Sequence, residues 1–377
     1  MRPLVSIITP SYNQGKFIRE TIESVLTQDY ANIEYIIVDG KSTDNSLDII
    51  REYEGRLVYI SENDHGQSDA INKGFKMAHG EIIAWLNSDD VYEPGGIRRA
   101  VEEFERNDRL GLVYGDGYII DENSSKLKVF EYTQEFDYWK LINFWDYIMQ
   151  PATFFRTEML KRVGYLDVNL HYCMDWDLWI KLAAISEVKY IPELLACSRE
   201  YGSTKTSTGG DTRLNEITGL LQKYSGKEKP LGMQSYRAST FYIKQSEKFW
   251  PIRIMAGWYL AYKHKWLNKK LPIQYEDGWI GKEYAFIVPQ YVSKVEISIL
   301  NIFEKVLPLE VSIELNGIET KKMMFTENIS VKWTLDLSRK RSKAFDEIHI
   351  RCSRAAKPGA GDDRKISIRM DKVKYTP

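Results

Sequence analysis

One segment of the chain joins an apolar run to a cluster of oxygen-bearing side chains. Residues 82–86 are apolar and predict a buried strand, and Asn87, Ser88, Asp89 and Asp90 follow it directly. Two adjacent carboxylates repel each other unless a cation or hydrogen-bond donors compensate their charges. Asp, Asn and Ser oxygens suit a hard divalent ion, and Mg²⁺ typically takes one or two carboxylates together with substrate phosphates. The same residue types are common in turns, so the segment predicts either a metal site or a simple strand-to-turn transition.

A second acidic pair lies in the segment Cys173–Leu182. Asp175 stands at the expected start of a helix, Asp177 follows two residues later, and the apolar residues after them keep helical spacing. Acids near a helix N-terminus stabilise the helix dipole, which is the simplest interpretation. A carboxylate kept ionised at such a position can also serve as a general base. These residues alone leave both roles open.

The first 120 residues alternate between predicted strands and helices. Strands are expected at residues 4–8, 35–38, 57–60 and 82–86, separated by segments with helical periodicity. This alternation predicts an α/β fold, a parallel sheet with helices on both faces. Polar residues follow the strands at 9–13, 39, 64–69 and 87–90. Because the carboxyl ends of such strands face one crevice of a doubly wound sheet, we expect a ligand site there.

The bulk properties narrow the class of protein. With 377 residues, 43% apolar and 28% charged side chains, the chain is expected to form two or three globular domains. Its formal net charge of −1 gives no indication of a nucleic-acid partner. Three scattered cysteines form neither a disulfide framework nor a zinc motif. Without a signal peptide or an apolar run of about 20 residues, a cytoplasmic setting is expected.

Two common phosphate-binding loops do not occur where they would be needed. The sequence contains no GxxxxGK[ST], and no GxGxxG follows the first strand. A nucleotide bound at this edge would need another way to hold its diphosphate, such as a metal ion on Asp89.

Three motifs resemble the N-terminal half of inverting glycosyltransferases of family 2, which have the nucleotide-sugar-binding GT-A fold. The motifs are Ser6–Asn13 (SIITPSYN), Ile36–Asp44 (IIVDGKSTD) and Gly80–Asp90 (GEIIAWLNSDD). Together with the acidic segment at 173–182, the resemblance covers roughly residues 3–210. It implies a GT-A-type doubly wound mixed sheet and a nucleotide-sugar donor linked to UDP or GDP.

The resemblance also implies roles for residues on the donor side. Pro10, Tyr12 and Asp39 would hold the nucleobase and ribose, and Asp89 would bind Mn²⁺ or Mg²⁺ on the diphosphate. Asn87 stands where the family usually has the first Asp of its DxD element. A bound metal ion would therefore have one negatively charged carboxylate fewer beside it. The remaining donor-side candidates are Gln67, Asp69, Ser88, Arg199 and Lys205.

Two further departures from the family pattern concern the diphosphate. Ile71 occupies a position where the family tends to have Arg, and Tyr201 replaces the His of an Arg-x-His element. Cations for the leaving phosphates are then expected from Lys73, Arg199 or Lys205. The last two lie in a polar loop of the kind that can close over a donor.

The segment at Asp175 resembles the family's ED motif, with Met174 in place of the usual Glu. The resemblance implies that Asp175 takes the proton of the acceptor hydroxyl as the hydroxyl attacks the anomeric carbon, and Asp177 is the alternative base. The acceptor-side candidates are Gln150, Trp176 and Asp177.

The chain is predicted to have three parts. Residues 1–210 would form the catalytic domain, 211–275 a helical extension and 276–377 an all-β sandwich. The basic, aromatic stretch 248–272 predicts a helix that lies either in a membrane interface or against the catalytic domain. Short strands and turns such as Asn316–Gly317 predict the sandwich, which resembles accessory modules of bacterial sugar-modifying enzymes. Glycan binding, a scaffold role and a homo-oligomer contact are left open for it.

Together these features predict a metal-dependent inverting glycosyltransferase with a glycan or lipid-linked acceptor. It would build a bacterial surface polysaccharide in the cytoplasm or at the inner face of the membrane. A nucleotidyltransferase on a similar sheet would be expected to carry a Gly-rich loop after the first strand. A non-catalytic sugar- or nucleotide-binding assembly protein is the other alternative. The departures at Asn87, Ile71 and Tyr201 support that alternative, whereas Asp89 and Asp175 oppose it.

Overall fold

The chain divides into two compact units. The first contains Met1–Phe136 and Lys140–Lys244, and the second contains Asp137–Trp139 and Gln245–Pro377. Each unit has an apolar core of its own. The computed structural model describes residues 2–202, 204–246, 255, 259, 272, 274–275, 277–289, 292–337, 345–358, 362, 364–371 and 373–376.

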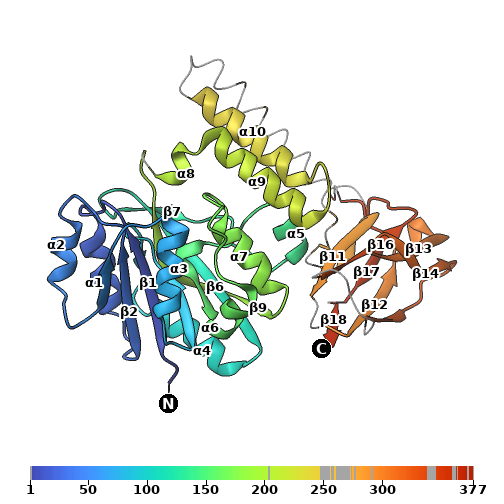
Figure 1. Ribbon diagram of the computed structural model, residues 1–377. Coiled ribbons are helices and arrows are strands. Elements are labelled where there is room, and N and C mark those ends of the chain that lie inside the picture. The colour runs from blue at the N-terminus through green and yellow to red at the C-terminus, as the bar shows by residue number, and fades with distance from the viewer. Residues whose placement is uncertain are drawn as a thin grey trace. The chain divides into compact units, whose positions relative to one another are not determined.

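A nine-stranded mixed sheet forms the centre of the first unit (Figure 1). Its order is β3-β2-β1-β4-β8-β6-β9-β5, with β7 paired to β6. β1 to β4 run parallel to one another, whereas β8 runs antiparallel to β4 and β6. The predicted doubly wound mixed α/β sheet is confirmed. The strands are β1 (Val5–Ser11), β2 (Ile33–Asp39), β3 (Val58–Ser61), β4 (Ile82–Trp85), β5 (Val91–Tyr92), β6 (Leu110–Ile120), β7 (Lys126–Val129), β8 (Thr153–Arg156) and β9 (Glu187–Arg199).

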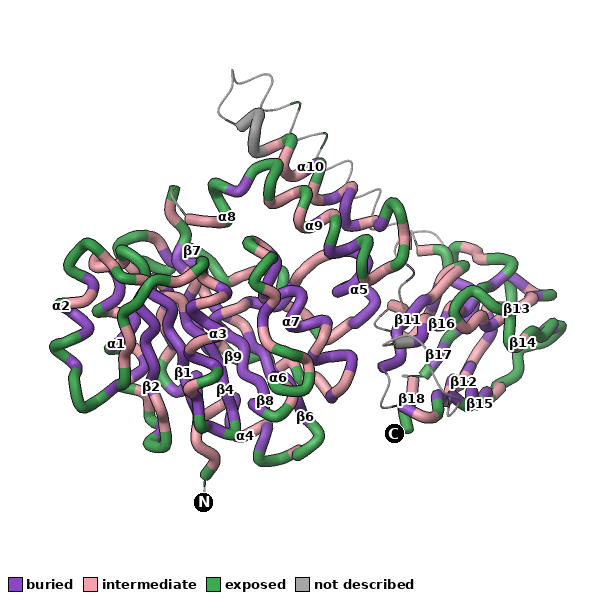
Figure 2. The backbone as a smooth tube through the Cα atoms, viewed as in Figure 1, coloured by how far each residue is buried: buried purple, intermediate pink, exposed green. Residues whose placement is uncertain are grey.

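The parallel strands bring their carboxyl ends to one edge of the sheet. Ser11 at the end of β1 lies beside Asp39 at the end of β2, and Asp39 lies beside Ser61 at the end of β3. Every residue of β1 and β4 is buried. β4 is entirely apolar, whereas β1 also buries Ser6, Thr9 and Ser11. Figure 2 shows this burial along the central strands. The acidic segment after β4 therefore projects from the same edge as the ends of β1 and β2.

Ten helices with described bounds accompany this sheet. Of these, α3 packs against β1 and β2, α4 against β6 and β9, and α7 against β6. Helix α4 and the two-residue strand β5 were not predicted from the sequence. The helices are α1 (Ile18–Leu26), α2 (Ser46–Arg51), α3 (Gln67–Met77), α4 (Gly96–Arg106), α5 (Tyr138–Asn143), α6 (Thr157–Val163), α7 (Met174–Ala183), α8 (Lys205–Thr208), α9 (Gly210–Ser225) and α10 (Leu231–Ser246).

An aromatic cluster connects β4, β8, α3 and α7. Trp85 stacks on Trp179 with ring centroids 5.3 Å apart. Phe155 meets Phe75, Trp85 and Trp179 edge-on at 5.8, 6.1 and 5.9 Å. Because these rings join the strand before the acidic tip to the helix that carries Asp175, they fix two sides of the site relative to each other.

The second unit consists of two antiparallel sheets. Their orders are β10-β17-β12-β15, with β18 on β12, and β11-β16-β13-β14. Asn316 and Gly317 have φ angles of 53° and 81° and close the β13–β14 hairpin, as their sequence predicted. The all-β prediction is confirmed. The strands are β10 (Trp279–Ile280), β11 (Glu283–Pro289), β12 (Lys294–Ile302), β13 (Leu309–Leu315), β14 (Ile318–Phe325), β15 (Val331–Asp336), β16 (Phe345–Cys352), β17 (Ile368–Met370) and β18 (Lys374–Thr376).

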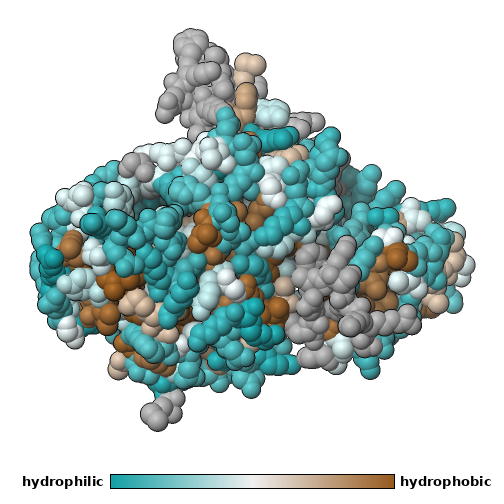
Figure 3. Space-filling model, viewed as in Figure 1, coloured by the Kyte–Doolittle hydropathy of each residue, from teal (hydrophilic) through white to brown (hydrophobic). Residues whose placement is uncertain are grey.

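The predicted helical extension is observed as α9 and α10, up to Ser246. Apart from Met255, Tyr259 and Pro272, the stretch 248–272 lies outside the described residues, so both interpretations of it stay predictions. Within the described residues, no helix is both long and apolar enough to cross a membrane. Hydrophilic side chains cover most of the face seen in Figure 3. The boundaries at 210 and 275 also stay predictions.

Candidate active site

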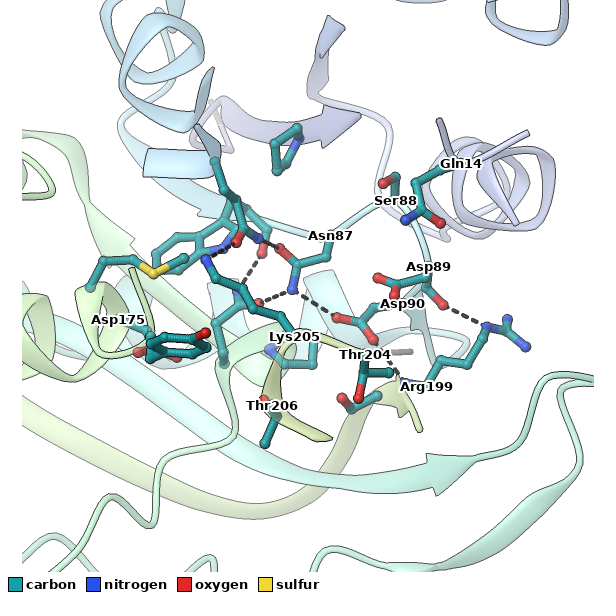
Figure 4. Close-up of a pocket in the computed structure, with 18 of the residues that line it drawn as sticks. Gln14, Asn87, Ser88, Asp89, Asp90, Asp175, Arg199, Thr204, Lys205 and Thr206 are labelled. Carbon is teal, nitrogen blue, oxygen red and sulfur yellow. Dashed lines mark hydrogen bonds between the residues drawn. The ribbon is translucent and has the colours of Figure 1, made fainter. Parts of the chain in front are cut away.

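A cavity of about 650 Å³ opens at the carboxyl ends of β1 and β4 (Figure 4). Its walls come from the end of β1, the start of α3, the segment after β4, the start of α7 and the connection from β9 into α8. In Figure 4, Asp89 and Asp175 lie on opposite sides, with Lys205 between them. A polar cavity at this edge is the expected place for a ligand. Of the predicted site residues, those lining it are Pro10, Tyr12, Gln67, Asn87, Ser88, Asp89, Gln150, Asp175, Arg199 and Lys205.

Asn87 is the centre of a hydrogen-bond network. Its amide nitrogen donates to Asp90 Oδ2 at 3.0 Å and to Gln150 Oε1 at 2.9 Å. Its Oδ1 accepts from Gln67 Nε2 at 2.8 Å, and Gln67 Oε1 accepts from Lys205 Nζ at 2.9 Å. An ionised carboxylate at position 87 could not donate to these oxygens. This hydrogen-bond network therefore favours Asn over the family's usual Asp.

Asp90 and Arg199 are buried behind the acidic tip. Asp90 Oδ1 accepts from the backbone N–H of Arg199 at 2.9 Å. Burial and the charge of Asp89 raise the pKa of Asp90 to about 8. The Arg199 guanidinium donates to the Asp89 carbonyl at 2.7 Å. Its further partners are Glu20, the Asp121 carbonyl and Ser124. These contacts make Arg199 a residue that orders the loops around the tip, and its guanidinium is committed to protein groups.

Asp89 and Asp90 both line the cavity, and Asp89 is the less buried of the two. Tyr201 OH donates to Asp89 Oδ2 at 2.8 Å, and the Tyr201 ring lies 5.1 Å from that of Phe17. Burial raises the pKa of Asp89, and the Tyr201 hydrogen bond opposes this shift. Among the described residues, no group of three His, Cys, Asp or Glu side chains could hold a metal ion. The Asp89 carboxylate fits a Mn²⁺ or Mg²⁺ ion that is shared with substrate phosphates, but it does not by itself form a complete protein cage.

Asp175 lies in the first turn of α7 and lines the opposite wall. Its Oδ1 accepts from the backbone N–H of Trp176 at 2.8 Å. Burial raises the pKa of Asp175, while this hydrogen bond and the charges of Lys205 and Arg213 oppose the shift. A second carboxyl, Asp146, has a pKa raised well above its usual value by burial and by the charge of Asp175. A carboxylate with a raised pKa is a stronger base, which suits proton abstraction.

Lys205 extends from α8 into the cavity. Besides bonding Gln67, its Nζ lies 5.9 Å from the centroid of the Tyr172 ring. Burial lowers the pKa of Lys205, and the charges of Asp175 and Glu216 oppose this shift. An ammonium group between two carboxylates of the cavity is placed where it can meet a phosphate.

Two predicted donor-side residues do not line the cavity. Asp39 accepts from the Ser42 hydroxyl at 2.5 Å and from the Ser61 hydroxyl at 2.7 Å. Asp69 lies 3.7 Å from Lys73 Nζ, and Lys73 is likewise absent from the cavity lining. These groups order the loops that follow β2 and β3.

Two predicted acceptor-side residues point away from the cavity. Trp176 is buried and donates from Nε1 to a backbone carbonyl at 2.8 Å. Asp177 accepts from Tyr224 OH at 2.5 Å and from Lys223 Nζ at 2.9 Å. Burial would raise the pKa of Asp177, but these partners hold it below its usual value. Of the two acids near the start of α7, Asp175 is the one that faces the cavity.

The cavity also contains residues beyond the predicted set. Asp64 belongs to the polar segment 64–69 that is expected at this edge, although it is not among the assigned site residues. Gln14 directly follows the segment 9–13, so its position after a strand end is a usable signal. His171 and Tyr172 line the wall just before α7. Their place depends on how α7 packs, so the sequence carries little signal for them.

The first unit is an α/β domain with a mixed sheet and a polar cavity at the carboxyl ends of its parallel strands. The family profile described as glycosyl transferase family 2 matches residues 6–164. An uncharacterised glycosyltransferase of Rickettsia typhi is 33% identical over 238 residues, covering 62% of this chain and 74% of the relative. Another of Rickettsia prowazekii is 32% identical over 235 residues, covering 61% and 73%. The chain belongs to glycosyltransferase family 2, as its motifs predicted.

Other similar proteins match less of the chain or at lower identity. A Bacillus subtilis protein, provisionally named a teichuronic acid biosynthesis glycosyltransferase, is 42% identical over 106 residues, covering 27% of this chain and 42% of that protein. S. aureus TarS, solved with UDP-GlcNAc, has a TM-score of 0.48 at 18% identity, covering 67% of this chain and 79% of TarS. The mannosyltransferase PcManGT from Pyrobaculum calidifontis, solved with GDP-Man and Mn²⁺, has a TM-score of 0.49 at 16% identity, covering 71% and 84%. Structural similarity with TM-scores of 0.48 and 0.49 does not support a conclusion about the function of this chain.

Proposed function

We propose that this chain is an inverting glycosyltransferase that uses a UDP- or GDP-linked sugar donor and a divalent cation. The observation that carries the proposal is the pair Asp89 and Asp175, which face one cavity from opposite sides. The volume of about 650 Å³ lies within the usual range for small-molecule sites. One carboxylate is thus available for the donor's diphosphate and the other for the acceptor.

Inversion requires a single displacement at the anomeric carbon. Asp175 accepts the proton of the acceptor hydroxyl while the hydroxyl oxygen attacks the carbon from the face opposite the diphosphate. The bond from that carbon to the diphosphate oxygen breaks, and the nucleoside diphosphate leaves with both electrons. Lys205 binds the leaving phosphates as negative charge grows on them.

Asp89 would hold Mn²⁺ or Mg²⁺ together with the phosphates of the donor, and the bound cation would offset charge on the leaving diphosphate. Tyr12 and Pro10 line the donor side of the cavity. The Tyr12 side chain is 61% exposed, so its ring can stack on a nucleobase. The name of the Bacillus subtilis relative, a teichuronic acid biosynthesis glycosyltransferase, supports a polysaccharide as the product. We extend the proposal to a surface polysaccharide and to a glycan or lipid-linked acceptor.

The test combines binding and turnover. Titration calorimetry with UDP and GDP, with and without Mn²⁺, should show cation-dependent binding that Asp89→Asn weakens. Asp175→Asn should lower transfer by about 10²–10⁴-fold, the usual contribution of a general base, and leave nucleotide binding unchanged. Equal wild-type affinity with and without Mn²⁺ would contradict the cation role, and unchanged turnover in Asp175→Asn would contradict its role as base.

A further inference from the structure

The backbone just before α7 directs three N–H groups at one side chain of α9. Glu216 Oε1 accepts from the N–H of Tyr172 at 2.5 Å and of Cys173 at 2.6 Å, and Oε2 accepts from the N–H of His171 at 2.9 Å. Cys173 is the N-cap residue of α7, and its side chain makes no capping hydrogen bond. These three N–H groups precede the first residue of α7, so the carboxylate holds the backbone that leads into the helix. Its negative charge near the helix N-terminus also offsets the helix dipole.

The segment held by Glu216 is a wall of the cavity. His171, Tyr172, Met174 and Asp175 all line the cavity, and Glu216 contacts this wall from α9. Three consecutive bonds to one carboxylate fix the backbone immediately before Asp175. Because Asp175 is two residues beyond Cys173, a shift of this backbone would move the carboxylate of Asp175 as well.

The same wall is contacted twice more by the chain that leads into α9. Lys205 Nζ lies 5.9 Å from the centroid of the Tyr172 ring. Gly209, between α8 and α9, packs so closely that a Cβ there would lie 2.8 Å from Tyr172 Cε1. Residues 205–216 and the wall segment 171–175 therefore touch at three places.

We propose that Glu216 is a positioning residue that holds segment 171–175 and so sets where Asp175 stands in the cavity. The proposal rests on the proposed function of Asp175 as base. Lys205 and Glu216 both belong to the stretch 205–216, which contacts the segment 171–175. A donor phosphate bound by Lys205 would therefore also stabilise the position of the segment that carries Asp175. Donor binding and the placement of the base would then be coupled through residues 205–216.

The test uses the full chain with Glu216→Ala, Glu216→Gln and the control Asn215→Ala, an exposed neighbour on α9. Hydrogen–deuterium exchange at residues 171–173 should become faster in Glu216→Ala and stay unchanged in the control. With the donor that the wild type uses, kcat should fall by about 10–100-fold, the cost of a misplaced reacting group. Binding of the nucleoside diphosphate with Mn²⁺ should stay as in the wild type.

Glu216→Gln is expected to have an intermediate effect on exchange and on kcat. It also keeps the test possible if Glu216→Ala does not fold. Its one carbonyl oxygen can keep the two bonds of Oε1, so its exchange rate and kcat should lie between those of the wild type and Glu216→Ala. A lower melting temperature of the Glu216 variants with unchanged kcat would show a merely structural role and would overturn the proposal. Unchanged hydrogen–deuterium exchange at residues 171–173 would overturn it as well. A wild-type chain that turns over no donor would contradict the proposed function itself, whereas an active wild type with equally active Glu216 variants contradicts only the positioning role.

Discussion

Asp175 and Asp146 are two carboxyls whose titrations influence each other. Burial raises the pKa of both carboxyls, and each has a backbone N–H donor and the charge of Arg213 to favour its ionised form. The charge of Lys205 favours the ionised form of Asp175 in addition. The negative charge of Asp175 raises the pKa of Asp146 further. The carboxyl that ionises first is therefore Asp175, and Asp146 keeps its proton to higher pH.

This order predicts a pH dependence of transfer. The base must be ionised, so kcat/KM should fall as pH drops through the pKa of Asp175, which lies above the ordinary Asp value of 3.8. Asp146→Asn replaces a neutral carboxyl by a neutral amide, so this variant should keep activity and a similar acid limb. The check is kcat/KM measured across pH for the wild type and both Asn variants. An inactive Asp146→Asn beside an active Asp175→Asn would assign the base to Asp146.

Tyr201 should compete with a cation for Asp89. Its hydroxyl occupies Asp89 Oδ2, while its ring is held by packing on Phe17. Tyr201→Phe keeps the ring and removes the competing bond. Since a hydrogen bond contributes about 1 kcal/mol net, Mn²⁺-dependent affinity for a nucleoside diphosphate should rise by roughly fivefold. Calorimetry without Mn²⁺ is the control. Weaker binding in Tyr201→Phe would show instead that the hydroxyl helps to hold the cation.

The sequence could indicate which residue types gather at the site, but only partly which of them face it. The ends of parallel strands share an edge by topology, so Asn87 and Asp89 could be placed without a structure. Asp39 and Arg199 could not be assigned in this way, because distant partners, such as Ser61 and Glu20, decide where their polar groups point. The same limit applies to Glu216, whose partners lie more than 40 residues earlier in the chain.

At the level of elements, the aromatic cluster ties β4 to α7. Trp179 is fully buried between Trp85 and Phe155, yet its Nε1 has no hydrogen-bond partner among the described residues. The Trp179 side chain therefore stabilises the fold through packing and not through a hydrogen bond to the described residues. Trp179→Ala should lower the free energy of unfolding by about 3–5 kcal/mol, the usual cost of removing a large buried ring.

Trp179→Phe separates packing from hydrogen bonding. It keeps an aromatic ring and removes an N–H that has no partner, so its cost should be clearly smaller than that of Trp179→Ala. Urea unfolding followed by circular dichroism measures both variants. Equal losses in the two variants would show that the indole nitrogen has a partner that the described residues do not reveal.

Most regular elements were predictable from their apolar period, and β5 and α4 were missed for different reasons. β1 and β4 are buried along their whole length, and such runs are recognisable. β5 has two residues and is held by pairing with β9, so its own sequence cannot specify it. Helix α4 carried a signal, since Ile97, Val101 and Phe104 recur at helical spacing and are buried.

At the scale of the whole molecule, the two units have separate cores. The core around the nine-stranded sheet is built from residues between Val5 and Ala196, and the core of the all-β unit from residues between Ile280 and Met370. The cavity is lined entirely by residues of the first unit. Folding of the first unit and binding at its cavity should therefore not require the second core.

A chain that ends at residue 276 tests this independence. It keeps every lining residue of the cavity, so it should unfold in a cooperative transition and bind UDP or GDP with Mn²⁺ as the full chain does. Residues 277–377 alone should also fold, because two antiparallel sheets with a shared apolar core are enough for independent stability. Scanning calorimetry of the full chain and both parts would compare the transitions. If the shortened chain folds but no longer binds the nucleotide, the second unit contributes to the site, and the independence argued from the separate cores is wrong.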